Sequence, residues 1–171
     1  MQQNPIYVCE IKTPLGMMTA AATDKGICLL DFADPRKVKS DLTFLKKKLK
    51  AEILKSKNIH LKNLEVELKE YFTKKRKKFS VPLITVGTDF QNKSWNQLKK
   101  IPYGKTNSYK EQAQAINHAK AFRAVANANG RNKIAIIIPC HRVTGSNGAL
   151  GGYSSGIDKK KFLLKLEGFE E

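Results

Sequence analysis

The sequence has few cysteines and no long apolar run. Three cysteines are an odd number, and the N-terminal residues lack the basic and then apolar segments of an export signal, so we expect reduced thiols in a cytoplasmic protein. The longest apolar run, residues 134–138, falls far short of the ~20 residues that cross a bilayer. The sequence therefore argues against a disulfide-stabilised secreted domain and against a membrane protein.

Acidic residues are also scarce. The chain has 171 residues, with 32 lysines and arginines against 15 aspartates and glutamates, and a net charge of +17. Through residue 86 there are 18 basic and nine acidic residues, and beyond it 14 and six, so the excess marks neither half. This charge favours a polyanionic partner such as nucleic acid, although a lysine-rich surface that only keeps the protein soluble is an alternative.

The N-terminal half has the pattern of a small α/β domain. Three short apolar stretches separated by turn-forming residues predict an antiparallel sheet, with strands at residues 6–11, 17–22 and 27–32. Apolar residues then recur every three or four positions over residues 38–53 and 61–72, which predicts two amphipathic helices that cover the sheet. Residues 81–86 could add one more strand.

The C-terminal half has the pattern of a mainly helical domain. A linker at residues 87–89 leads into a helix that residues 101–104 end, so we expect domains at 1–86 and 87–171. Ser108 and Glu111 form a capping box before a helix that runs to about residue 118. A short helix at residues 121–129 follows a tight connection, which suggests a helix-turn-helix.

The residues with the most distinctive chemistry follow the apolar run at 134–138, which we expect to be a buried strand. They read Pro-Cys-His-Arg-Val at residues 139–143. A thiol on a rigid element beside a base or a positive charge is how proteins present a sulfur nucleophile. The alternative is that Cys140 is a small buried hydrophobe and His141 a hydrogen-bonded core residue.

The Pro-Cys-His-Arg-Val motif and its surroundings resemble the O6-methylguanine-DNA methyltransferase family. The matching segments occur in order and at family-like spacing, at residues 101–104, 108–109, 123–125, 130–132, 139–143, 152–154 and 163–168. The N-terminal half matches only loosely, through residues 13–16.

The resemblance implies a fold and an activity. The expected fold is a ribonuclease-H-like α/β domain followed by a mainly α, winged-helix-like domain that carries the helix-turn-helix. The expected activity is repair of double-stranded DNA, in which O6-alkylguanine, and less readily O4-alkylthymine, is flipped out of the duplex. The alkyl group then moves stoichiometrically and irreversibly to Cys140, with no cofactor. We expect a monomer that could bind DNA cooperatively.

The resemblance also assigns roles around the sulfur. Cys140 corresponds to the alkyl acceptor. His141, bridged through water to Glu167, corresponds to the base that takes the thiol proton. Asn132 corresponds to the asparagine that ties the turn before the active-site strand.

Further roles concern the DNA and the base. Arg123 matches the arginine that fills the space of the flipped nucleotide, and Tyr109 matches the tyrosine that assists rotation and donates to guanine N3. Small residues near Arg123 would let the helix approach the minor groove; these are Ala121, Ala124 and Ala126. The expected pocket residues are Val143, Tyr153 and Ser154.

The chain departs from the family's usual residues at Phe122, Asn129, Lys133 and Ala135. These departures concern the shape of the pocket rather than the transfer chemistry. We expect no metal, because the candidate ligands Cys9, Cys28 and His60 are scattered and fit no ligand spacing.

Three other classes of protein are compatible with parts of the sequence. A non-enzymatic lesion reader would keep the helix-turn-helix and the arginine but lack the cysteine. A helix-turn-helix transcription factor would protect a defined DNA sequence and gain little affinity from a lesion. A cysteine hydrolase would use Cys140 and His141, but neighbours in sequence rarely face the same substrate, and no third orienting group is obvious by hydrolase spacing.

Overall fold

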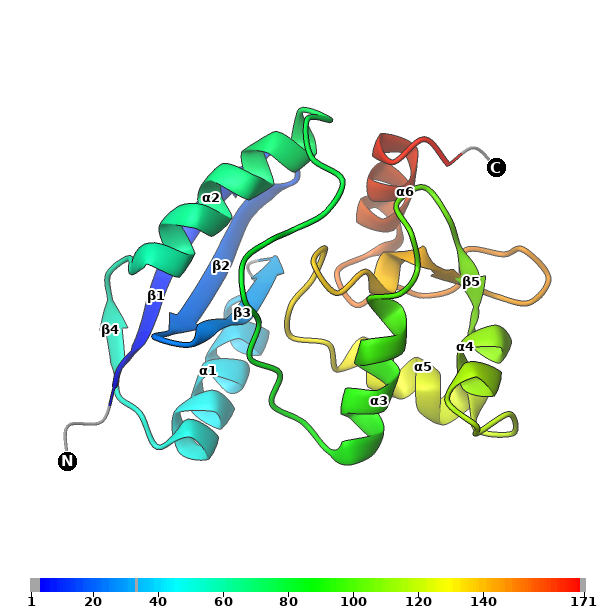
Figure 1. Cartoon of the computed structure of the whole chain (residues 1–171), viewed down its shortest axis with the longest axis horizontal. Helices are drawn as coiled ribbons and strands as arrows, with labels where there is room; N and C mark the ends of the chain where they lie inside the picture. The colour runs from blue at the N-terminus through cyan, green and yellow to red at the C-terminus, as the bar shows by residue number, and fades with distance from the viewer. Residues whose placement is uncertain (1–3, 33, 170–171) are drawn as a thin grey trace. The chain divides into compact units, whose positions relative to one another are not determined.

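The two halves of the chain fold as separate units in the computed structural model, at Met1–Val86 and Gly87–Glu171 (Figure 1). The structure describes residues 4–32 and 34–169. Within these ranges, none of the helices combines the length and the apolar character that a bilayer-spanning segment requires.

The first unit is built on a four-stranded mixed sheet. Strands β1 (Ile6–Thr13), β2 (Gly16–Thr23) and β3 (Gly26–Phe32) pair antiparallel, which confirms the three predicted strands. A short strand that the sequence analysis missed, β4 (Ile53–Lys55), pairs parallel with β1, so the strand order is β3-β2-β1-β4. The sheet is therefore mixed rather than purely antiparallel.

Helix α1 (Pro35–Leu49) is shorter than predicted. The Asp34 side chain caps its start by accepting two backbone N–H groups, and the helix ends at Lys50, whose φ of 50° is left-handed. The prediction that this helix reaches residue 53 is wrong. The turn at Lys50 reverses the chain, so Ile53 joins the sheet edge instead, although its spacing from the earlier apolar residues fits a helix.

Both helices of the first unit pack on the sheet through apolar residues. Leu45 of α1 lies in a buried cluster whose other members are Ile6, Ala21, Cys28, Leu29 and Ala51. Helix α2 (Ile59–Phe72) contacts β1, β2 and β3, along which it runs in Figure 1. Its buried apolar residues are Leu61, Leu64, Leu68 and Tyr71. The predicted apolar stripe is confirmed for Leu61, Leu64 and Leu68, but Tyr71 and not the predicted Phe72 is the buried aromatic residue of the last turn.

Residues 81–86 do not form the predicted additional strand. The segment runs beside β3 with one isolated bridge, in which the Ile27 N–H donates to Pro82 O and the Ile84 N–H donates to Ile27 O, both at 2.8 Å. Pro82 has no N–H with which to extend a ladder. The approach is close, because a Cβ on Gly26 would lie 2.6 Å from Pro82 O.

The second unit is mainly helical. Its helices are α3 (Asp89–Leu98), α4 (Tyr109–Ala115), α5 (Phe122–Gly130) and α6 (Ile157–Leu166). The Ser108–Glu111 capping box is present at the start of α4, which ends three residues earlier than predicted. Two short strands, β5 (Asn107–Ser108) and β6 (Val143–Thr144), pair in parallel and tie the start of α4 to the segment after Cys140.

A buried pair of amides joins the two short helices. Gln112 of α4 donates to Asn129 Oδ1 at 2.9 Å, and Asn129 of α5 donates back to Gln112 Oε1 at 2.8 Å. Gln112 also donates to the Ser94 carbonyl of α3 at 3.2 Å. Buried amides that satisfy each other define one arrangement of the helices, so this pair sets how α5 is presented.

Candidate active site

The segment before the cysteine is a buried turn and not the predicted strand. Ile134, Ile136 and Ile138 are each at most 2% exposed, but the backbone turns, and Ile136 has a φ of 71°. A β-branched residue in this region is strained and needs support from its surroundings. Asn132 supplies that support, because its amide donates to Ile138 O at 2.9 Å and its Oδ1 accepts the Ile134 N–H at 2.9 Å.

Cys140 begins the short 3-10 helix η1 (Cys140–Arg142) directly after this turn, and it is half-buried. The Asn132 amide that holds the turn also donates to Cys140 Sγ at 3.4 Å. A hydrogen bond donated to sulfur favours the thiolate over the thiol. Asn132 therefore both positions the sulfur and stabilises its negative charge.

His141 and Glu167 are in direct contact. His141 Nε2 lies 2.8 Å from Glu167 Oε1, and both side chains are buried, so the expected water bridge between them is wrong. Burial by itself would raise the pKa of Glu167, but hydrogen bonds from His141 and Arg142 outweigh it and lower the pKa to about 2. Glu167 is therefore a carboxylate at neutral pH.

The charge on Glu167 determines the tautomer of His141. A carboxylate only accepts hydrogen bonds, so His141 Nε2 carries the proton that Glu167 receives. Burial lowers the pKa of His141, more than its contact with Glu167 raises it, and the imidazole is neutral at neutral pH. Its Nδ1 is then a free base, and it makes no hydrogen bond to the described residues.

Arg142 completes the support of Glu167. Its guanidinium donates twice to the Glu167 carboxylate and once to Ile101 O, each at 2.8 Å. The Gly104 N–H also points at Glu167 Oε2, at 3.4 Å. From the sequence, Arg142 was expected only to supply a positive charge near the thiol. Its partners lie in two of the family-like segments, Ile101 in residues 101–104 and Glu167 in residues 163–168.

Lys160 is a site residue that sequence reasoning missed. It is fully buried on α6, where its Nζ donates to Val143 O at 2.6 Å, to Gly152 O at 3.1 Å and to Leu150 O. Burial lowers the pKa of Lys160 to about 8, with the charge of Cys140 opposing the shift. Lys160 thus holds the loop between β6 and α6 in place. The sequence gives no sign of this role, because Lys160 is one of several lysines in the same helix.

Replacing Lys160 with methionine should loosen this loop, because three carbonyls that face one ammonium lose their donor. We expect the free energy of unfolding to fall by about 3 kcal/mol and amide exchange to speed up across residues 143–152. Urea unfolding and hydrogen exchange measure both effects. The matched control is Lys161→Met at the exposed neighbour, which should change neither. Equal stability of the two variants would contradict the role of Lys160.

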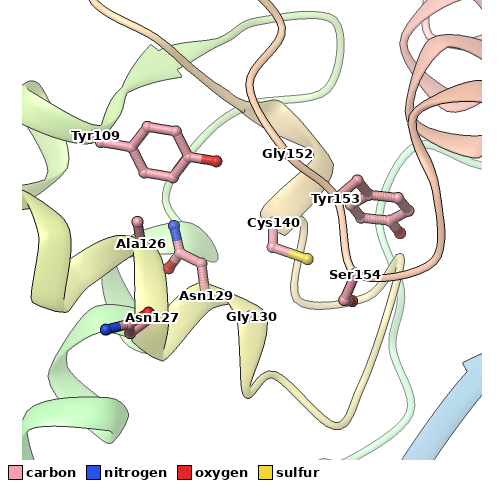
Figure 2. Close-up of a pocket in the computed structure, with 9 residues that line it drawn as sticks. All are labelled: Tyr109, Ala126, Asn127, Asn129, Gly130, Cys140, Gly152, Tyr153 and Ser154. Carbon is pink, nitrogen blue, oxygen red and sulfur yellow. The ribbon is translucent and has the colours of Figure 1, made fainter.

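A pocket of about 360 Å³ opens beside the Cys140 sulfur (Figure 2). It is lined by Tyr109, Ala126, Asn127, Asn129, Gly130, Cys140, Gly152, Tyr153 and Ser154. In Figure 2 the sulfur lies between Tyr109 on one side and the loop of Tyr153 and Ser154 on the other. All of these residues belong to the second unit, so the pocket is complete within it.

Tyr109 and the loop between β6 and α6 shape the wall of this pocket. Gly151 has a φ of 71°, and a Cβ on it would lie 3.3 Å from Tyr109 Cε2 and 3.4 Å from the hydroxyl. Burial raises the pKa of Tyr109, and the charge of Cys140 raises it further. The hydroxyl therefore stays protonated and is a hydrogen-bond donor at neutral pH.

Other residues singled out in the sequence lie around the pocket rather than in it. Val143 is fully buried in β6, and it is the Val143 carbonyl that meets Lys160. Arg123 and Ala124 are exposed on α5, outside the lining. Ala121 precedes α5 as its N-cap residue instead of lying within the helix.

The described residues contain no group of three metal-ligating side chains. Cys28 is buried in the sheet, where desolvation raises its pKa to about 12. His60 Nε2 lies 2.9 Å from the Asp24 carbonyl. Cys9 is half-buried, and burial raises its pKa as well.

Comparisons with known proteins find the same family that the site residues indicate. Residues 6–85 match the ribonuclease-like domain of 6-O-methylguanine DNA methyltransferase, and residues 89–169 match its DNA-binding domain. The methylated-DNA–protein-cysteine methyltransferase of Methanosarcina barkeri is 43% identical over 162 residues, which are 95% of this chain and 97% of that protein. The inducible enzyme of that name from Bacillus subtilis is 40% identical over 147 residues, 86% of this chain and 82% of that protein.

Solved structures show the same likeness in three dimensions. Mycobacterium tuberculosis OGT in complex with DNA has a TM-score of 0.80 and 36% sequence identity, and the match covers 94% of this chain and 92% of that one. Two domain matches that together span most of the chain, and relatives this similar over nearly their whole length, leave no other assignment. The chain belongs to the O6-methylguanine-DNA methyltransferase family.

Proposed function

We propose that the protein repairs double-stranded DNA by moving the alkyl group of O6-alkylguanine, and less readily that of O4-alkylthymine, onto its own Cys140. The observation that carries the proposal is a cysteine sulfur that opens into a pocket and is followed directly in the chain by a buried histidine in contact with a buried carboxylate. The names of its relatives support it, because they describe methyl transfer from DNA to a protein cysteine.

The chemistry is a displacement at carbon. The Cys140 thiol gives its proton to the free Nδ1 of His141, and the sulfur attacks the alkyl carbon in line with the C–O6 bond. The S–C bond forms as the C–O6 bond breaks, and guanine leaves with the electron pair. Guanine takes one proton from water, and His141 releases to water the proton that it received from the thiol. The Tyr109 hydroxyl donates to guanine N3 and so stabilises the departing base. The thioether is stable, so each chain reacts once and needs no cofactor.

The target carbon is out of reach in a stacked duplex, so the nucleotide must be everted at a cost of a few kcal/mol. Arg123 is exposed on the side of α5 opposite its buried residues, where its guanidinium can fill the vacated space. The small side chains of Ala124 and Ala126 let the helix approach the minor groove closely. Such contacts suit a repair protein, because they depend little on the neighbouring sequence. We expect one chain to act on one lesion.

Intact-mass spectrometry after incubation with duplex DNA that contains O6-methylguanine tests the proposal. The protein should gain the mass of one methyl group per chain and no more, and peptide mapping should place it on Cys140. Undamaged duplex of the same sequence is the control and should add nothing. A protein that stays unmodified after prolonged contact with the damaged duplex, or one that removes many methyl groups per chain, is incompatible with the proposal.

A further inference from the structure

Phe122, the first residue of α5, is an exposed aromatic side chain directly before Arg123. Its exposed fraction is 43%, and it makes no ring contact with the other described residues. The family resemblance marks this position as one where a small residue is common. Single exposed apolar side chains are common on protein surfaces, but Phe122 lies next to the arginine that enters DNA in the proposed function, on the first turn of the same helix.

The position of Phe122 on the helix points it towards the pocket side. The buried residues of α5 define its inner side; they are Val125, Ala128 and Asn129. At 100° per residue Arg123 lies opposite them, and Phe122 lies between the two, on the flank that carries Ala126 one turn later. Ala126 lines the Cys140 pocket. The ring is therefore at the pocket-side edge of the surface that faces DNA.

When α5 approaches a groove of the DNA, a large ring at this edge can act in only two ways. It holds the helix away from the duplex, or it enters the duplex itself. The first outcome would keep Arg123 from reaching the base stack, although Ala124 next to it leaves room for a close approach. The second removes the ring from water and returns part of the stacking that the everted nucleotide gives up.

We propose that Phe122 enters the duplex beside Arg123 as an apolar wedge, packed against the base step next to the everted nucleotide. This inference rests on the proposed function. The two side chains divide the work: the guanidinium fills the polar space of the missing base, and the phenyl ring covers an exposed base face. Every base has such a face, so the wedge adds no sequence preference of the hydrogen-bonding kind.

The test compares two DNA substrates under single-turnover conditions. One carries O6-methylguanine in an intact duplex, and the other carries it in a one-nucleotide bulge, where less stacking has to be broken. Phe122→Ala should slow transfer from the intact duplex about tenfold, as loss of one base–aromatic contact does, and should slow transfer from the bulge much less. Phe122→Leu, which keeps an apolar wedge, should recover most of the rate.

The matched control is Phe162→Ala on α6, a phenylalanine with a similar exposed fraction of 38%, which should transfer at the unaltered rate on both substrates. A Phe122→Ala variant that is as fast as or faster than the unaltered protein on the intact duplex overturns the wedge, since the ring would then be neutral or an obstacle. Equal slowing on both substrates also overturns it, because the defect would lie in the pocket. Failure of the unaltered protein to transfer at all would defeat the proposed function first.

Discussion

Replacing Cys140 with alanine should abolish alkyl transfer completely while the protein still binds damaged DNA. The sulfur is the atom to which the new bond forms. Among the described residues that line the pocket, the other polar groups are hydroxyls and amides, which are far weaker nucleophiles at neutral pH. Cys140 is half-buried on a turn held by Asn132, so loss of one sulfur atom should leave the fold intact.

Two measurements together decide this prediction. Intact mass after exposure to O6-methylguanine duplex reports transfer, and a gel-shift or fluorescence titration with the same duplex reports binding. The matched control is Cys9→Ala, a second half-buried cysteine that lies in β1 of the other unit, and it should react fully. Methyl transfer by the Cys140→Ala protein would remove the basis of the proposed function. If the Cys140→Ala protein failed to fold, its urea unfolding transition would change, and this would distinguish a folding defect from a loss of transfer chemistry.

Replacing Glu167 with glutamine should impair both stability and transfer. The carboxylate takes hydrogen bonds from His141 and Arg142, and the variant leaves the buried guanidinium without its counter-charge. Breaking a buried pair in this way costs about 3–5 kcal/mol. The amide also no longer dictates that His141 Nε2 is protonated, so Nδ1 is less often the free base, and transfer should fall by about 10²-fold or more.

The pH dependence of stability distinguishes a contribution of the Glu167 charge from a contribution of its packing alone. The pKa of Glu167 in the folded protein is lowered to about 2 from an ordinary 4.5. The folded state therefore prefers the charged form, and the stability that this provides is present above pH 4.5 and is lost as the pH falls towards 2. A difference of this size corresponds to roughly 3 kcal/mol.

The stability gap between the unaltered protein and Glu167→Gln should therefore narrow as the pH falls below 4.5. Urea unfolding at a series of pH values measures it. The control is Glu111→Gln at the exposed capping box of α4. The difference in unfolding free energy between this variant and the unaltered protein should be small at every pH. If the stability difference caused by Glu167→Gln stayed constant with pH, the charge of the carboxylate would not contribute to stability. If the variant transferred the methyl group at the unaltered rate, Glu167 would not position His141.

Much of the candidate site was predictable because it is encoded in short stretches of sequence. The thiol and the imidazole are neighbours at residues 140 and 141, and the capping box at Ser108 and Glu111 is a local pattern that the structure shows as predicted. The three strands of the first unit were also predictable, since turn residues separate them at short intervals. Local chemistry and short loops leave few alternatives.

Other features were not predictable from the spacing of apolar residues, because hydrogen bonds and strand pairing that this spacing does not record decide them. Five consecutive apolar residues at 134–138 fit a strand, but the side chain of Asn132 supplies hydrogen bonds in place of strand neighbours. Ile53 continues a helical spacing, yet the left-handed turn at Lys50 delivers it to the edge of β1. In the first case a local side-chain hydrogen bond, and in the second the pairing of Ile53 with Ile6, outweighed the preference that the apolar pattern indicates.

The sequence by itself determined the reactive thiol, its neighbouring base, the helices that flank them and the family resemblance, because each is written in residues close together along the chain. Only the tertiary structure decided that Glu167 binds His141 directly, that Arg142 shares that carboxylate and that Lys160 pins the pocket loop. Those contacts join residues 8 to 26 positions apart. Buried charges are stable only when paired, so folding must bring the partners together, and no local pattern records which partners they will be.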